Sequence, residues 1–401
     1  MSRERANSIL EEILGTIEIP DSAYETAERR YRDFGGWIGR RESNCYAFDP
    51  HIYVQGSFRL GTVIRPLDEG KPYDLDFSCN LENGVTKTSH TQEALKALVG
   101  SEVESYRKAR GIQATMTEKT RCWRLEYADQ LNFHMDIVPC IPEADDQRRT
   151  IQDAMIRAGS ADRALARVVA DLTVGITDNR RPNYRVLSTD WNVSNPEGYA
   201  RWFEARMKLA ASHFDKRLIE AKAAKIDDLP AFKWKTPLQR CVQILKRHRD
   251  IRFAKNPDSK PISIIITTLA ARAYQGESDP DLAMERVLGS IGGLINRQSP
   301  RVPNPVNPAE DFADKWATPE GRANRLEENF VAWIEQANAD FKLITSSTDT
   351  DFISAQAMQK LGARLNSTRL KEKVGIAAPA IIVSPKSHQI TETPARPWCK
   401  K

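Results

Sequence analysis

Three stretches of the sequence decide the fold: Gln55-Gly56-Ser57-Phe58-Arg59-Leu60-Gly61-Thr62, Tyr73-Asp74-Leu75-Asp76-Phe77 and Phe133-His134-Met135-Asp136-Ile137-Val138. The second and third alternate polar and apolar residues, as a strand with one buried face does. Residues two apart in a strand face the same side, so Asp74 and Asp76 project together. A neighbouring strand would bring Asp136 to the same place. The sequence therefore predicts three carboxylates in one small space.

Three carboxylates in one space indicate a metal site. Without a cation they repel, and one of them tends to take up a proton, whereas a divalent metal removes the conflict. Carboxylates on adjacent strands are also the arrangement used for two-metal phosphoryl transfer. We therefore expect two Mg²⁺ ions, with Mn²⁺ as a substitute, at Asp74, Asp76 and Asp136. The alternative is that these are ordinary carboxylates at strand ends.

The Gly-Ser step upstream predicts a turn that binds phosphate. Glycine lets the backbone approach an anion closely, and an N–H group and a hydroxyl then bind phosphate oxygens. Gln55, Gly56 and Ser57 are therefore candidate nucleotide-binding residues. The segment has no Walker lysine, so it is not a P-loop.

The composition is that of a folded globular protein. Of 401 residues, 40% are apolar and 28% are charged, which excludes collagenous and wholly disordered chains. The longest nearly apolar run, 262–271, is far shorter than the roughly 20 residues that span a bilayer. The cysteines lie far apart, so neither a disulfide framework nor a zinc finger is expected. The N-terminus lacks the apolar core of a signal peptide, and we expect a cytoplasmic protein without a membrane-spanning segment.

The first half of the chain predicts an α+β unit with a mixed β-sheet. Residues 3–42 are typical of a helix, a break and a long amphipathic helix. Beyond them, a helix over Thr91–Lys108 separates two groups of β-branched and aromatic runs. The expected strands cover 52–55, 73–79, 112–117, 122–127 and 131–139.

The second half is predicted to be helical, after a polar connection at residues 177–198. We expect a catalytic lobe over residues 1–195 that includes the long N-terminal helix, a helical lobe over 196–384 and a loose tail over 385–401. Expected helices of the helical lobe cover 199–223, 237–253, 262–275, 281–297, 311–346 with a break at Thr318–Pro319, and 355–361.

Positive charge is concentrated in the segment Lys233–Lys255, which holds eight Lys and Arg residues against Asp250 alone. Such a segment binds a long nucleic acid, frames a pocket for nucleoside triphosphates, or forms a solvated helix face. Arg121 and Arg124 are candidates for base or phosphate contacts, but we favour salt bridges with residues such as Glu118 or Glu126. His134 lies beside Asp136, but hard cations prefer oxygen ligands, so we do not expect it to bind metal.

The three stretches resemble the nucleotidyltransferases of the DNA polymerase beta superfamily. More narrowly, the chain resembles the bacterial cGAS/DncV-like nucleotidyltransferases, which make cyclic oligonucleotide second messengers in anti-phage signalling. The resemblance extends into the second half through Gln239–Asp250, Pro261–Ile265 and Asn304–Phe312. It implies a catalytic lobe, a helical lobe and an active site in the cleft between them. The sixteen residues between Ser57 and Asp74 form a longer loop than the family motif has.

The resemblance also implies roles for individual residues. Asp74 and Asp76 would bind the metals, and Asp136 would complete the site and help to activate the acceptor hydroxyl. Gly56 and Ser57 would hold the donor triphosphate, and so would Lys246 and Ser263 from the helical half. Two alternatives remain from the sequence: Lys246 as a solvated lysine, and Ser263 as a simple helix N-cap.

The expected activity is the joining of nucleoside triphosphates, ATP and GTP, into a cyclic product with release of pyrophosphate. We favour cyclic GMP-AMP. The resemblance implies a partner effector protein that senses the product in anti-phage defence, and no long nucleic acid is required. The first alternative is a nucleotidyltransferase that modifies an RNA end or a protein. The second is an idle fold used for binding, against which the intact carboxylate set argues.

Overall fold

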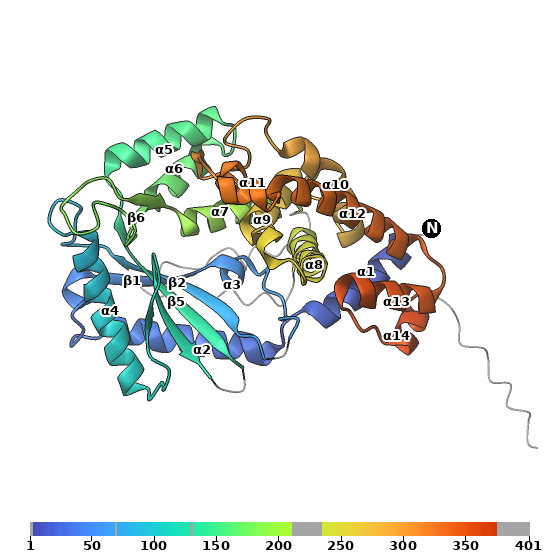
Figure 1. Cartoon of the computed structure of the whole chain (residues 1–401), viewed down its shortest axis with the longest axis horizontal. Helices are drawn as coiled ribbons and strands as arrows, with labels where there is room; N and C mark the ends of the chain where they lie inside the picture. The colour runs from blue at the N-terminus through green and yellow to red at the C-terminus, as the bar shows by residue number, and fades with distance from the viewer. Residues whose placement is uncertain (1–2, 69, 129–130, 211–234, 375–401) are drawn as a thin grey trace, which may run out of the picture.

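The computed structural model describes residues 3–68, 70–128, 131–210 and 235–374, and it has the expected α+β architecture (Figure 1). A mixed seven-stranded sheet runs in the order β1-β2-β5-β4-β3, and two short strands, β6 and β7, extend it beside β5. The parallel pair at its centre is β2 with β5. The strands are β1 (Pro50–Gln55), β2 (Tyr73–Leu81), β3 (Thr117–Glu118), β4 (Trp123–Tyr127), β5 (Phe133–Pro142), β6 (Val174–Ile176) and β7 (Asn192–Ser194).

Two helices pack against the sheet, α2 (Asp21–Ile38) and α4 (Gln92–Ala109). Phe34 of α2 stacks on Phe77 of β2, with ring centroids 6.0 Å apart. The predicted helix over Thr91–Lys108 is confirmed as α4, and the Thr91 side chain caps it by accepting the Ala94 N–H. The predicted strand over 112–117 is wrong, because the ladder with β4 includes only Thr117 and Glu118.

A second core is built from helices. It contains α1 (Arg3–Ile17), α5 (Asp145–Arg157), α6 (Arg163–Asp171), α7 (Pro196–Met207), α8 (Pro237–Arg252), α9 (Ser263–Ala273), α10 (Pro280–Ser290), α12 (Leu326–Ser346), α13 (Thr350–Leu361) and α14 (Ser367–Lys373). The helix-break-helix prediction for the N-terminus is confirmed, with Pro20 at the start of α2. Because α1 packs on helices and α2 on the sheet, this segment contacts both cores. The lobe boundary at residue 195 stays a prediction.

The predicted helix over 311–346 is wrong at its start. Asp311 ends a small hairpin of β8 (Pro303–Asn304) and β9 (Asn307–Asp311), and its carboxylate accepts the N–H groups of Arg301, Val302 and Ala313. These bonds hold the chain in a turn, and the helical residues resume in α11 (Pro319–Ala323) and α12.

The helices expected over 237–253 and 262–275 agree with α8 and α9 to within two residues. The helix expected over 281–297 is α10, which already ends at Ser290, and the helix expected over 355–361 is the second half of α13, which begins at Thr350. The helix expected over 199–223 is α7, which begins at Pro196 and ends at Met207, and its part beyond residue 210 and the tail over 385–401 lie outside the described residues. The sequence did not predict α5, α6 or α14. Among the described residues, no helix has the length and apolarity to cross a membrane.

Candidate active site

Strands β2 and β5 bring the three aspartates together. In the parallel ladder Asp76 lies directly beside Asp136, and Asp74 lies two residues before Asp76 on the same strand. Apolar neighbours fix the direction of these side chains, because Leu75, Phe77 and Met135 are fully buried on the other face of the sheet. The predicted convergence of Asp76 and Asp136 is thus a consequence of strand register.

A cavity of about 920 Å³ lies in front of these strands, between the sheet and helices α8 and α9. Both halves of the chain contribute to its wall. The predicted site residues that line it are Gly56, Ser57, Asp74, Asp76, Lys246 and Ser263. Asp136 and Gln55 are not part of this wall. Gln55 lies beside Asp76 on β1, but its side chain accepts a hydrogen bond from Ser78 at 3.1 Å.

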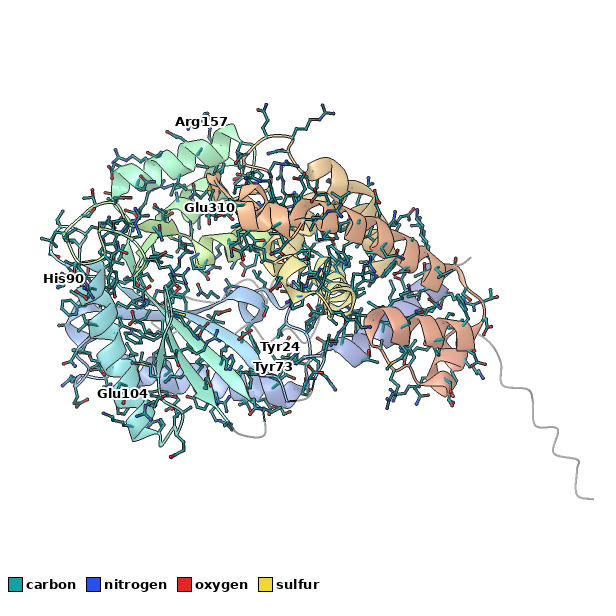
Figure 2. All side chains as sticks on the ribbon, in the orientation of Figure 1. Tyr24, Tyr73, His90, Glu104, Arg157 and Glu310 are labelled. Carbon is teal, nitrogen blue, oxygen red and sulfur yellow. The ribbon has the colours of Figure 1, made fainter. Side chains whose placement is uncertain are left out.

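Gly56 approaches the carboxylate of Asp76 as no other residue type could. Its φ of +67° lies in the left-handed region, and a Cβ atom there would be 2.5 Å from Asp76 Oδ2. Gly56 opens the short helix α3 (Gly56–Leu60). Phe58 anchors this helix on the aromatic rings of Tyr24 and Phe133. Tyr73, which is labelled with Tyr24 in Figure 2, packs on the same Phe133.

Burial and the neighbouring carboxylates make a negative charge on Asp76 unfavourable. Burial, then the negative charges of Asp136 and Asp74, raise the pKa of Asp76 from 3.8 to about 7, although Arg124 and Lys246 oppose the rise. A carboxyl group with this pKa is largely protonated below neutral pH. The site thus favours a proton or another cation at Asp76.

Lys246 is buried rather than solvated. Only 6% of the residue is exposed, and its Nζ donates a hydrogen bond to the Thr62 carbonyl at 2.8 Å. Burial, helped by the charge of Arg249, lowers the pKa of Lys246 to about 7. The ammonium group has three N–H donors, so the bond to Thr62 leaves two for a ligand in the cavity. The alternative of a solvated lysine is wrong.

Four side chains of α8 bind backbone carbonyls of the loop that follows α3. Gln239, Gln243, Lys246 and Arg247 donate to the carbonyls of residues 60, 63, 62 and 65. They lie on one face of the helix, and we call these four contacts the α8 seam. Because Lys246, Arg247 and Arg249 are all buried, a solvated basic face is the wrong interpretation for this part of the Lys233–Lys255 segment.

Arg124 holds Asp136. Its Nε and Nη2 atoms donate to the two carboxylate oxygens at 2.7 Å each. The predicted cross-strand salt bridge of Arg124 is confirmed, but its partner is Asp136 and not Glu118 or Glu126, because Asp136 lies directly opposite it in the antiparallel β4–β5 ladder. The sequence signal was present, as both residues occupy the same face of adjacent strands, but the register was not known.

Arg121 and His134 have partners outside the expected ones. Arg121 pairs with Asp178 at 3.1 Å rather than with a glutamate on its own hairpin. His134 Nδ1 lies 3.4 Å from Asp74 Oδ1, and Nε2 lies 4.0 Å from Glu126 Oε1. His134 therefore neighbours the carboxylate cluster without adding an oxygen ligand to it.

Ser263 is the first residue of α9, and Ile262 occupies the N-cap position. The N-cap alternative for Ser263 is therefore wrong. Its Oγ instead accepts a hydrogen bond from Arg249 Nη1 at 2.8 Å. Sequence reasoning did not single out Arg249, since nothing distinguishes it from the other basic residues of the segment before the fold is known.

The carboxylates have the chemistry of a Mg²⁺ site, because they are hard oxygen ligands on adjacent strands and Asp76 is poised to bind a cation. Within the described ranges, no three His, Cys, Asp or Glu side chains are already arranged around one point. Asp136 faces Arg124, and Asp74 lies near His134. Each carboxylate has about four lone-pair positions, so Asp136 retains acceptor capacity beside Arg124. The donor chemistry of the three residues therefore fits a hard divalent metal.

The raised pKa of Asp76 predicts how the metal-free protein responds to pH. The folded state favours protonated Asp76, so stability from this group is present below pH 3.8 and is lost as pH rises to about 7. In EDTA, the wild-type Tm should therefore fall relative to Asp76→Asn between about pH 4 and pH 7, and the difference should level off above that. Thermal unfolding of both proteins tests this. A difference in Tm that does not change with pH would contradict it.

Known proteins resemble this chain in sequence. The family model of the DncV-like cyclic GMP-AMP synthase nucleotidyltransferase domain matches residues 50–139. A c-di-GMP synthase of Roseivirga ehrenbergii is 26% identical over 351 residues, which cover 85% of this chain and 80% of that protein. Cyclic dinucleotide synthase CdnG of Bradyrhizobium diazoefficiens is 23% identical over 333 residues, which cover 77% and 70%.

Solved structures have the same fold. The Bradyrhizobium diazoefficiens CD-NTase CdnG in complex with GTP superposes with a TM-score of 0.60 at 20% identity, covering 92% of this chain and 98% of that one. The Vibrio cholerae di-nucleotide cyclase DncV, as a mutant with ATP and GTP, gives a TM-score of 0.55 at 12% identity, covering 91% and 97%. Residues 50–139 thus match the DncV-like nucleotidyltransferase domain, and the chain as a whole is similar to bacterial cyclic dinucleotide synthases.

Proposed function

We propose that this protein joins nucleoside triphosphates into a cyclic dinucleotide by metal-dependent nucleotidyl transfer. The observation that carries the proposal is one shared cavity lined by Gly56, Ser57, Asp74, Asp76 and Lys246, with Asp136 directly beside Asp76 on the neighbouring strand. Anion-binding groups from both lobes thus face a cluster of carboxylates. In a triphosphate that carries Mg²⁺, the negative phosphates complement the anion-binding groups and the cation complements the carboxylates.

In the proposed reaction, a ribose hydroxyl of one nucleotide attacks the α-phosphorus of another. The bond to pyrophosphate breaks, pyrophosphate leaves, and a second attack of the same kind closes the ring. The bound metal ions would lower the pKa of the attacking hydroxyl and neutralise charge on the triphosphate. Asp74, Asp76 and Asp136 hold the metals. No nucleophile from the protein is needed.

The remaining residues position the donor. The Ser57 hydroxyl and a backbone N–H of the Gly-Ser turn bind phosphate oxygens, and Gly56 allows the approach. Lys246 directs its remaining N–H donors at the triphosphate, and Ser263 contacts the same phosphates. Binding of the anion would keep Lys246 protonated near neutral pH, because an adjacent negative charge raises a lysine pKa.

GTP is the substrate that we propose for at least one of the two positions. Two relatives support this choice, one called a c-di-GMP synthase and one solved in complex with GTP. Cyclic GMP-AMP, the product that we expected, needs ATP at the other position, and cyclic di-GMP needs a second GTP. We also propose, from the resemblance alone, that an effector protein senses the product in anti-phage defence.

A polymer acceptor is less well supported. A protein that binds RNA uses exposed Lys and Arg residues to neutralise phosphates. Several of the basic residues between 235 and 249 are instead buried in contacts with the protein itself: Lys235, Lys246, Arg247 and Arg249.

The test is an incubation of the purified protein with all four nucleoside triphosphates and Mg²⁺ or Mn²⁺, followed by phosphatase treatment and mass spectrometry. We expect a phosphatase-resistant product whose mass contains guanosine monophosphate. The Asp74→Asn, Asp76→Asn double variant should not form it. Transfer of nucleotide to added RNA or protein, without a cyclic product, would replace this proposal with the polymer-acceptor alternative.

A further inference from the structure

Arg249 is a buried cation in the wall of the cavity, and the proposed reaction assigns it no role. Only 6% of its side chain is exposed. Nη1 donates to the Pro261 carbonyl at 3.1 Å and to Ser263 Oγ at 2.8 Å, while Nε and Nη2 donate to Asp250 Oδ1 at 2.9 and 2.7 Å. These contacts use four of the five N–H groups of the guanidinium and hold it on both edges.

The contact with Ser263 fixes the direction of the serine hydroxyl. A guanidinium has no acceptor, so Ser263 must use its own hydrogen on a different partner. Thr267, one turn along α9, donates its hydroxyl to the Ser263 carbonyl and not to Oγ. Since Ser263 lines the cavity, a phosphate oxygen there is a suitable acceptor.

We propose that Arg249 is a positioning residue that orients the Ser263 hydroxyl toward the triphosphate. The inference rests on the proposed function, because a triphosphate must occupy this cavity for the orientation to matter. Arg249 acts through Ser263 and through the Pro261 carbonyl, which together fix the start of α9. Asp250 binds the other edge of the guanidinium and keeps it from turning into the cavity itself.

The proposal predicts coupling between two residues in nucleotide binding. The α,β-methylene analogues of GTP and ATP cannot transfer their α-phosphoryl group, so their affinity in Mn²⁺ can be measured by calorimetry without turnover. Arg249→Met and Ser263→Ala should each weaken binding about tenfold, as expected for a charge-assisted hydrogen bond and its target. The double variant should bind about as well as either single variant.

The controls separate positioning from folding. Arg252→Met removes an exposed arginine from the same helix, outside the cavity wall, and should leave affinity unchanged. If Arg249→Met does not fold, the same cycle is run with Arg249→Lys, which keeps the charge but lacks the fork that reaches Ser263 and Asp250 together. That variant should have the wild-type Tm and a weakened affinity, and its effect on affinity should disappear when it is combined with Ser263→Ala.

Two results would overturn the proposal. One is an equal loss of affinity from the Arg249 substitution in the wild-type protein and in the Ser263→Ala variant, since independent effects multiply. The other is a wild-type affinity in Arg249→Lys and Arg249→Met. Because binding is measured without turnover, a protein that makes no cyclic product still gives a result for Arg249, and failure of the proposed function remains distinguishable.

Discussion

Asp76→Asn is expected to reduce formation of the cyclic product at least about a thousandfold, because loss of several kcal/mol of metal stabilisation has this effect on rate. Asp76 is the aspartate of the cluster whose pKa is raised, because it is buried, lies beside Asp136 and follows Asp74 by two residues. Asparagine keeps the shape but removes the charge that binds a divalent ion. Product is measured by mass spectrometry after phosphatase treatment.

The same substitution should not unfold the protein. Metal-free Asp76→Asn should be at least as stable as the wild type near neutral pH, because asparagine removes the buried charge and its repulsion from Asp136 and Asp74, which together raise the Asp76 pKa to about 7. Asp162→Asn is the matched control, since it removes a carboxylate at the N-cap of α6, where asparagine also caps. Full activity in Asp76→Asn would show that the carboxylate cluster is not the metal site.

Gly56→Ala should reduce turnover about a hundredfold, because displacing a reacting group by about an ångström has this effect. The added Cβ would meet Asp76 Oδ2 at 2.5 Å, far inside van der Waals contact, so the Gly-Ser turn and the carboxylate must move apart. The left-handed φ also adds a cost in stability of about 1 kcal/mol. Turnover and the free energy of unfolding are both measured.

Gly111→Ala is the control for Gly56→Ala. Gly111 has nearly the same backbone conformation, with φ of +63°, but nothing lies within 4 Å of its added Cβ. Both variants should therefore lose a similar amount of stability, and only Gly56→Ala should lose turnover. Equal losses of turnover in the two variants would attribute the effect to stability and not to the approach of Gly56 to Asp76.

Short-range patterns explain what the sequence could predict. The period of two placed Asp74 and Asp76 on one face of a strand, and the Thr91 cap located the start of α4. The buried stripe of α8 follows the helical period, so that helix was also predictable. These features depend on residues close to one another in the sequence.

Features that depend on register or on distant partners could not be predicted. Arg124 pairs with Asp136 only because β4 and β5 meet in one particular register. Lys246 is buried because a carbonyl 184 positions earlier accepts its hydrogen bond. Asp311 turns the chain into a hairpin through bonds to N–H groups on both sides of it, although its surroundings in the sequence are typical of a helix start.

The α8 seam has a consequence for how this enzyme can change its substrates. Its four donors bind backbone carbonyls, which every amino acid possesses, and not side chains of the loop. The path of residues 60–65 is therefore largely independent of which side chains they carry. A cavity wall held in this way can exchange its side chains, by evolution or by design, and alter what the cavity accommodates without rebuilding the scaffold around the carboxylates.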